Sequence, residues 1–152
     1  MDADTIRIES ATPANLSTIR ALLGEAGLPH ADIVDGRGAR FWVLRAGGRA
    51  LGAVGLETYG SSGLLRSLVV APEARGSGLG GRLVDTLEAA ARNGGVRRLV
   101  LLTQTAEQFF SHRGYAVIER NDAPAEVRGS TEFRSLCPAS ATCMAKDLGP
   151  AS

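Results

Sequence analysis

A glycine-rich turn, residues 69–83 with the sequence VVAPEARGSGLGGRL, constrains this chain more than any other feature. It contains four glycines and lies between an apolar run and a stretch with helical spacing. Glycine reaches positive φ without strain and lets the backbone approach a ligand closely. A helix that begins after such a turn directs unpaired N–H groups and the positive end of its dipole toward the same point. The turn therefore predicts an anion site, and phosphate is the favoured anion.

The turn can be compared with three phosphate-binding motifs. A Walker A loop requires Lys and Ser or Thr where this chain has Arg82 and Leu83, so the contacts to phosphate and Mg²⁺ are missing. GSGLGG satisfies the glycine spacing of a dinucleotide fingerprint, but the next strand ends at Thr103 and supplies no acid for a ribose hydroxyl. The third motif, Arg-x-x-Gly-x-Gly, is met by residues 75–80, with an apolar strand before it and an amphipathic helix after it.

The patterns around the turn predict one α/β domain. The 152 residues are 44% hydrophobic, which is enough to bury a core. Period-two or apolar runs predict strands within residues 5–10, 40–60 (two strands, with a turn at Gly47-Gly48), 62–72, 96–103, 115–120 and 141–148. Helical spacing predicts helices within residues 12–26, from near Ser77 to 90, and 105–114. Residues 40–72 favour an antiparallel meander, and residues 29–40 are left unassigned.

Charge and composition argue against several classes of partner. The formal net charge of +1 gives no field that would attract nucleic acid or an anionic membrane. No apolar run is long enough to span a membrane, and the opening MDADTIRIES lacks a secretory pattern, so a cytoplasmic protein is expected. Two cysteines and two histidines are too few to predict a disulfide framework or a metal site.

The third motif and its surroundings resemble the GNAT N-acetyltransferases. LLRSLVVAPEARGSGLGGRLVDTLEAAA is similar to the strand, pyrophosphate loop and helix of that family, and AEQFFSHRGY is similar to the segment beside its pantetheine. The resemblance implies one GNAT domain over residues 1–152, with a mixed central β-sheet flanked by helices and no metal. SSGLLRSLVV, TQTAEQFFSHRGY and TEFRSLCPASATCMAKDL are most similar to the arsenic-resistance GNAT acetyltransferases.

The resemblance also implies where acetyl-CoA, the cosubstrate, would bind. Its pyrophosphate is expected on the N–H groups of residues 76–80, with Arg75 supplying screening charge or a structural contact. The backbone of the meander strand before the turn is expected to pair with pantetheine and to direct N–H groups at the thioester oxygen. The expected cosubstrate-binding residues are Leu68, Val69, Val70, Arg75, Gly76, Ser77, Gly78, Leu79 and Gly80.

Glu57 in GLETYG is the candidate general base, because a carboxylate at the end of an apolar strand can take a proton from the amine, through water. A salt-bridged structural role for Glu57 stays open, and Glu73 in the turn is a rival that would oppose an incoming phosphate. Arg66 lies within the apolar LLRSL and needs a partner, either a substrate carboxylate or Glu57. Arg66 and Tyr59 are the candidate substrate-binding residues.

The group that protonates the departing thiolate is not identified by the sequence. Many GNAT enzymes place a tyrosine where this chain has Phe110, which has no proton to give. Ser111, Tyr59, Tyr115 or a water could substitute, or the thiolate could leave unassisted because the pKa of a thiol is modest. His112 is expected to be a surface residue.

The resemblance implies a small amine as acceptor, with the α-amino group of an amino acid, or of an arsenic- or phosphorus-bearing analogue, as the first hypothesis. A protein N-terminus or a polyamine is the alternative. Cys137 and Cys143 suggest a different class, because soft thiolates bind trivalent arsenic. A metalloid-binding or acyl-CoA-sensing module without catalysis therefore stays open, as does homodimer formation.

Overall fold

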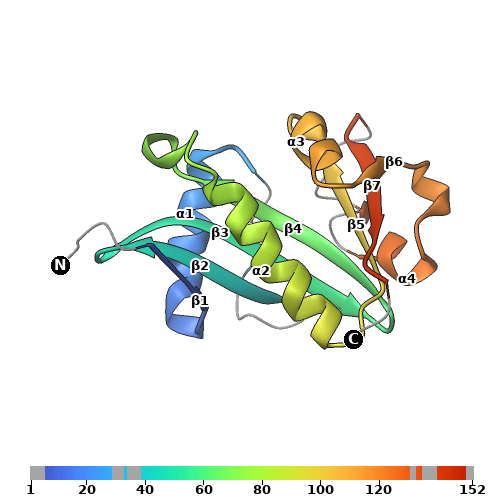
Figure 1. Cartoon of the computed structure of the whole chain (residues 1–152), viewed down its shortest axis with the longest axis horizontal. Coiled ribbons are helices and arrows are strands. Elements are labelled where there is room, and N and C mark those ends of the chain that lie inside the picture. The colour runs from blue at the N-terminus through green and yellow to red at the C-terminus, as the bar shows by residue number, and fades with distance from the viewer. Residues whose placement is uncertain (1–5, 29–32, 34–38, 131–132, 135–139, 150–152) are drawn as a thin grey trace.

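A computed structural model describes residues 6–28, 33, 39–130, 133–134 and 140–149 of the chain. Its centre is a seven-stranded mixed sheet with the strand order β1-β2-β3-β4-β5-β7-β6 (Figure 1). The strands are β1 (Ile6–Ser10), β2 (Arg40–Ala46), β3 (Arg49–Tyr59), β4 (Ser62–Val70), β5 (Arg98–Thr103), β6 (Ala116–Val117) and β7 (Thr142–Asp147). The described α-helices are α1 (Leu16–Glu25), α2 (Leu79–Asn93), α3 (Glu107–His112) and α4 (Ala125–Arg128).

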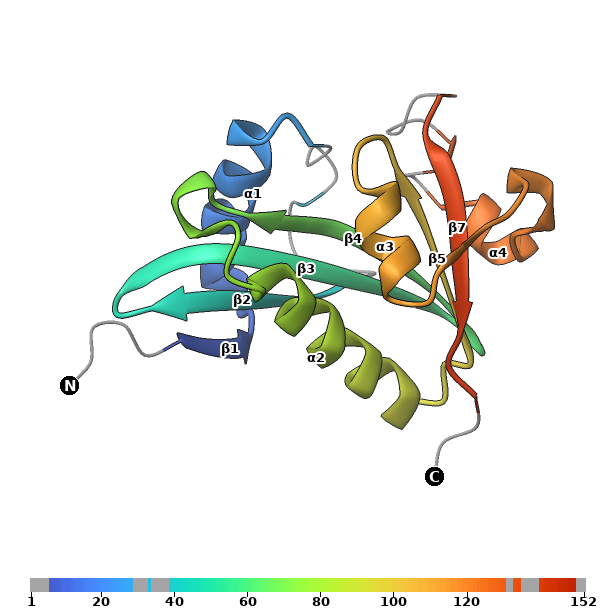
Figure 2. The ribbon, with the colours of Figure 1, turned by 45° about the horizontal axis from the view of Figure 1, so that its top comes forward.

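The sheet divides into two halves that are joined at one end. β2, β3 and β4 form the antiparallel meander that the sequence predicts, and β1 adds to its outer edge. β4 is parallel to β5, but the two strands pair only where residues 62–64 meet residues 98–100. Beyond these pairs the two strands diverge, as Figure 2 shows. The second half consists of β5, β7 and β6, with β7 in the middle.

β4 carries a bulge beside this division. Between the pairs Ala53–Val69 and Gly55–Arg66, one residue of β3 is opposite two residues of β4. Ser67 is one of these two, and with a φ of 61° it is the only non-glycine residue of the described chain with positive φ. A left-handed conformation costs a residue with a Cβ about 1–2 kcal/mol. Such strain persists only where the surrounding structure fixes it, and Ser67 is buried.

Helices cover both faces of the meander half. Side chains alternate along a strand, so Phe41 and Val43 of β2 pack with the residues of α1, and Trp42 and Leu44 pack with those of α2. Figure 1 shows α2 lying diagonally across the near face of the sheet, with α1 behind it. The apolar stripe of α2 is buried, as its helical spacing predicts.

The α/β fold with a mixed sheet and flanking helices is confirmed, while some boundaries differ from the expectation. α2 begins at Leu79, because Gly78 takes a left-handed N-cap conformation with a φ of 76°. The strand expected over residues 115–120 is wrong in length: it contracts to Ala116–Val117, because the chain turns into a 3₁₀ segment at Arg120–Asp122. α4 lies in a stretch that the sequence patterns left as a loop. Most of the unassigned segment, residues 29–32 and 34–38, lies outside the described residues.

Candidate active site

Two adjoining cavities lie where β4 and β5 diverge. The larger, of about 730 Å³, is lined by the end of β4, the glycine-rich turn and the first turn of α2, and is called the phosphate-loop cavity. The smaller, of about 240 Å³, is lined by Arg66, Ser67 and the connection from β5 to α3, and is called the Arg66 cavity. The two cavities meet at the five residues that line both, which are Ala26, Leu28, Leu68, Thr105 and Ala106.

The glycine-rich turn is held in a shape that only glycine adopts readily. Gly76 and Gly78 have φ values of 88° and 76°, and a Cβ at either position would meet nothing within 4 Å. Backbone conformation, and not lack of space, therefore requires glycine at both positions. This conformation leads into the first turn of α2, whose N–H groups lack helical acceptors. The turn and the helix N-terminus together form a wall suited to an anion.

Most of the predicted cosubstrate-binding residues line the phosphate-loop cavity. They are Leu68, Val69, Val70, Arg75, Gly76, Gly78, Leu79 and Gly80, whereas Ser77 is not among the lining residues. Arg75 Nε donates a hydrogen bond to the Val70 carbonyl oxygen at 3.0 Å. This bond ties the turn to the end of β4, so the geometry supports the structural contact that the sequence left open for Arg75.

Glu57 and Arg66 form a buried ion pair. Arg66 Nη1 lies 2.8 Å from Glu57 Oε2, and the two side chains are 1% and 9% exposed. The Tyr59 hydroxyl donates a hydrogen bond to Glu57 Oε1, and Arg66 Nε donates to Ser67 Oγ at 2.9 Å. Of the partners that the sequence left open for Arg66, the one seen in the structure is Glu57. Each carboxylate oxygen of Glu57 therefore accepts a hydrogen bond from the protein.

Arg66 and Glu57 differ in their access to the cavities. Arg66 lines the Arg66 cavity, whereas neither Glu57 nor Tyr59 is among the residues that line either cavity. The cavity thus faces the cationic member of the pair. The assignment of Glu57 as a base and of Tyr59 as a substrate contact remains a prediction, and either role requires a water or a side-chain movement to connect them with the cavity.

The rival base, Glu73, is not among the residues that line either cavity. Its carboxylate forms an ion pair with Arg49, and both side chains are exposed. A hydrogen bond from its own backbone N–H, reinforced by the charge of Arg49, lowers the pKa of Glu73. A lowered pKa makes a carboxylate a weaker base, so its environment does not favour Glu73 for proton removal.

The candidate groups for protonating the departing thiolate differ in their hydrogen-bond partners. The Tyr115 hydroxyl donates to Glu88 Oε2 at 2.9 Å, and burial together with the nearby Glu88 carboxylate raises the pKa of Tyr115. Tyr59 donates to Glu57, and Ser111 is exposed on α3. Neither tyrosine is among the residues that line these two cavities. Phe110 does line the Arg66 cavity, in edge-to-face contact with Tyr115 at 5.3 Å between ring centroids.

Three polar residues that the sequence analysis did not single out line the Arg66 cavity. Thr103 is the last residue of β5, and Gln104 and Thr105 follow it in the connection to α3. Thr103 Oγ1 accepts a hydrogen bond from the Ala106 N–H at 3.0 Å, and Thr105 lies where the two cavities meet. The sequence signal that could have found them is their position between a buried strand and the AEQFF segment.

The described part of the chain offers neither a metal site nor a membrane-spanning helix. It holds no group of three or more His, Cys, Asp or Glu side chains arranged to bind a metal ion. None of its helices combines the length and the apolar character that a membrane span requires. Cys143 is buried, and that burial raises the pKa of its thiol. Cys137 lies outside the described residues, so the hypothesis of paired thiols is untested.

Comparison with known proteins gives a family match. A family model described as an acetyltransferase (GNAT) domain matches residues 37–117, which is more than half of the chain and includes the glycine-rich turn.

The chain also matches parts of longer curated proteins. An amino-acid acetyltransferase of Ralstonia nicotianae is 36% identical over 59% of this chain and 20% of the relative. N-alpha-acetyltransferase 80 of Mus musculus is 46% identical over 37% of this chain and 18% of the relative. The chain thus spans about a fifth of the length of these relatives.

Solved structures share the fold at low sequence identity. N-acetylglutamate synthase from Neisseria gonorrhoeae, complexed with coenzyme A and N-acetyl-glutamate, superposes with a TM-score of 0.80 at 24% identity, covering 95% of this chain and 35% of that one. Rv2747 from Mycobacterium tuberculosis, in complex with CoA and NLQ, gives a TM-score of 0.78 at 24% identity, with 94% and 99% covered.

Proposed function

The chain belongs to the GNAT acetyltransferase family, and from that premise we propose that it transfers an acetyl group from acetyl-CoA to the α-amino group of a small amino acid or amino-acid analogue. One observation carries the proposal. The phosphate-loop cavity and the Arg66 cavity share a wall that includes Leu68, Thr105 and Ala106. A donor site and an acceptor site that meet in this way bring the thioester and the amine together.

The phosphate-loop cavity is the proposed site of acetyl-CoA. Its pyrophosphate lies on the N–H groups of residues 76–80, where the glycine conformation and the helix dipole both favour an anion. Pantetheine then runs along β4 beyond its last pair with β5, where backbone groups of residues 68–70 have no partner from β5. N–H groups of this stretch polarise the thioester carbonyl.

The Arg66 cavity is the proposed site of the amine. Among the described residues that line it, Arg66 is the only charged one, and its counter-ion Glu57 lies behind it. A carboxylate or another oxyanion on the acceptor would therefore meet a guanidinium, the group best suited to bind it. A polyamine would bring a positive charge to the same place, so the amino acid is favoured over the polyamine.

Proton transfer follows from the order of bond changes. The free amine attacks the thioester carbonyl, the carbon–sulfur bond breaks, and the nitrogen gives up its proton. Glu57 is the proposed final acceptor of that proton, through water at the Arg66 cavity. The thiolate takes its proton from solvent, because Phe110 offers none and both tyrosine hydroxyls are bonded to carboxylates.

Two further acceptors are considered for the Arg66 cavity. An amino-acid analogue that bears arsenic or phosphorus would place its oxyanion on Arg66, and this substrate is suggested by the resemblance of the sequence to arsenic-resistance enzymes. A protein N-terminus is the second candidate acceptor, because the mouse relative named N-alpha-acetyltransferase 80 is 46% identical over its matched segment. A homodimer, a cytoplasmic location and the absence of nucleic-acid and membrane partners remain expectations.

The test is release of free CoA thiol from acetyl-CoA in the presence of separate amines: amino acids, phosphonic and arsinic analogues, polyamines, and peptides with free N-termini. We expect turnover with α-amino acids or their analogues and a sharp rise in KM in Arg66→Met. Preference for polyamines would contradict the proposed role of Arg66. No turnover with any amine, while acetyl-CoA still raises the thermal midpoint, would indicate an acyl-CoA-sensing module instead.

A further inference from the structure

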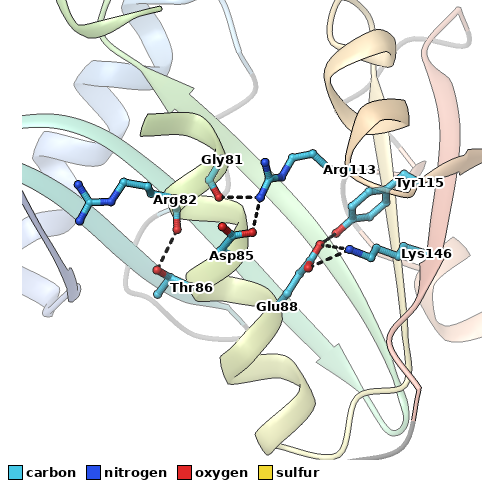
Figure 3. Close-up of polar contacts among 8 residues, drawn as sticks. All are labelled: Gly81, Arg82, Asp85, Thr86, Glu88, Arg113, Tyr115 and Lys146. Atoms are coloured by element: carbon cyan, nitrogen blue, oxygen red, sulfur yellow. Dashed lines mark hydrogen bonds and ion pairs between the residues drawn. The ribbon is translucent and has the colours of Figure 1, made fainter. Parts of the chain in front are cut away.

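Arg113, the residue directly after α3, reaches across to the first turn of α2. Its Nη2 donates a hydrogen bond to the Gly81 carbonyl oxygen at 3.2 Å and forms an ion pair with Asp85 Oδ1 (Figure 3). The centre of its guanidinium lies 5.8 Å from the centroid of the Phe109 ring, a distance typical of a cation–π contact. Arg113 therefore touches both α2 and the cavity-lining face of α3.

Gly81 provides the space for this contact. A Cβ at Gly81 would lie 2.7 Å from Arg113 Nη1, closer than real Cβ contacts allow. Gly81 has no positive φ, so its conformation does not require glycine. The guanidinium thus explains a glycine that the phosphate-loop motif, which ends at Gly80, leaves unexplained.

A second polar cluster joins the same elements further along α2. Glu88, buried on α2, accepts a hydrogen bond from the Tyr115 hydroxyl at 2.9 Å and pairs with Lys146 Nζ at 3.0 Å (Figure 3). Tyr115 follows α3, and Lys146 belongs to β7. Asp85 and Glu88 are three residues apart, so both lie on one face of the helix. We call these contacts, together with those of Arg113, the α2–α3 strap.

The strap spans the two halves of the sheet. α2 packs on β2, β3 and β4, whereas β7 pairs with β5 and α3 follows β5 in the chain. The halves pair only through residues 62–64 and 98–100, so the sheet itself does not fix the spacing of its divergent ends. Phe109 of α3 lines the phosphate-loop cavity, and Phe110 lines the Arg66 cavity. A shift of α3 against α2 would therefore move a wall of both cavities.

We propose that Arg113 is a positioning residue, which holds α3 against the first turn of α2 and so sets the distance between the bound thioester and the acceptor cavity. Its effect on catalysis rests on the acetyl transfer proposed above, but its effect on the shape of the phosphate-loop cavity does not. Arg113 acts through Phe109 and Phe110 and touches neither substrate.

Three variants separate the position of Arg113 from its charge. Gly81→Ala inserts a Cβ that displaces the guanidinium and keeps its charge, and alanine favours the helix over glycine, so this variant is expected to fold. Arg113→Met removes the charge and both polar contacts. Arg82→Met removes one charge from the same turn of α2, and the exposed Arg82 side chain points away from Arg113 in Figure 3.

The measurements are kcat and KM for acetyl-CoA and calorimetric titration with CoA. We expect Gly81→Ala and Arg113→Met to lower kcat by about 10- to 100-fold and to weaken CoA binding, because small displacements of reacting groups cost this much. Arg82→Met is expected to keep the wild-type kcat. Equal effects of the two charge-removing variants, or a wild-type kcat and CoA affinity in Gly81→Ala, would overturn the proposal.

Failure of the proposed function gives a different pattern. If the wild-type protein turns over no amine, acetyl transfer is refuted and the strap is judged by CoA affinity alone. Weaker CoA binding in Gly81→Ala than in Arg82→Met then supports the positioning role. Equal CoA affinity of the wild type, Gly81→Ala and Arg82→Met overturns it. Gly81→Ala decides the outcome if Arg113→Met fails to fold.

Discussion

Replacing Glu57 by Gln removes the counter-ion of a buried arginine while keeping the shape of the side chain. The glutamine carbonyl oxygen can still accept the hydrogen bond of the Tyr59 hydroxyl. Its amide group instead points two donors at the Arg66 guanidinium, where the native Nη1–Oε2 distance is 2.8 Å. Because the Arg66 side chain is only 1% exposed, water in the adjoining cavity compensates poorly for the lost carboxylate. The substitution therefore removes the carboxylate of Glu57 from a buried guanidinium.

The size of the effect follows from this burial. Removing one partner of a buried ion pair costs about 3–5 kcal/mol of unfolding free energy. A domain of this size loses about 2–4 °C of thermal midpoint per kcal/mol, so the midpoint should fall by about 6–20 °C. The double variant Glu57→Gln/Arg66→Met has no unpaired charge. It is expected to recover most of the loss, because apolar replacement of a buried pair is often neutral.

The assay is urea unfolding of the wild type, the two single variants and the double variant. Trp42 is the single tryptophan and is 3% exposed in the core, so its fluorescence reports global unfolding. A loss under about 1 kcal/mol in Glu57→Gln, the size measured for exposed pairs, would refute the reasoning. So would a double variant whose loss equals the sum of the two single losses, since that result means no coupling.

The same variant tests the proposed base. An α-ammonium group has a pKa near 8, so it is mostly charged at neutral pH and needs a base. Turnover in Glu57→Gln should fall by about 10²- to 10⁴-fold at pH 7 and partly recover at higher pH, while CoA binding survives. Full activity at neutral pH would remove Glu57 from the mechanism and leave it as the structural partner of Arg66.

Three further predictions follow from single residues. Gly78→Ala should lose about 1–2 kcal/mol of unfolding free energy and bind CoA more weakly, because the φ of Gly78 is 76°. Gly48 has open space around it and no positive φ, so Gly48→Ala is the neutral control in the same urea and CoA titrations. Burial and Glu88 raise the pKa of Tyr115, so the folded state holds its proton more tightly, and unfolding free energy should fall as pH rises above about 10. Tyr115→Phe should show a shallower fall in alkaline urea titrations, and an unchanged slope would contradict this assignment. Lys146 is the only lysine, so its chemical acetylation by an amine-reactive reagent can be followed by mass spectrometry. Lys146 should react slowly in the native protein and faster in Glu88→Gln, and equal rates would contradict the ion pair.

Local features of the site could be read from the sequence, because the residues that form them are neighbours in the chain. Gly76 and Gly78 supply the left-handed conformations of the turn, and the helical spacing after them predicts α2. The apolar runs likewise predict the meander and β5. In each case the chemical reason for the residue lies within a few positions of it.

Contacts between distant segments could not be read in the same way. The pair of Arg66 with Glu57 depends on the register of β3 with β4, in which Gly55 lies opposite Arg66 and Glu57 lies opposite Leu64. A shift of one residue reverses the face on which a side chain lies, and the sequence alone does not fix that shift. The contact between Arg113 and Gly81 joins residues 32 positions apart, and it depends on the angle at which α3 meets α2.

The placement of β7 between β5 and β6 has a consequence for how the chain folds during synthesis. β5 and β6 emerge from the ribosome before β7, but within the described sheet they do not pair with each other. β5 can pair with β4 on one edge, whereas its other edge and β6 must wait for residues 142–147. The meander and α2 can assemble earlier, since domains form from their N-terminal parts as synthesis proceeds. The second half of the sheet, and with it the contact of Lys146 to Glu88, closes last through long-range pairing, which is slow. A nascent chain halted before β7 would thus carry a formed phosphate-binding turn beside an unpaired strand edge, an exposed surface open to misassociation.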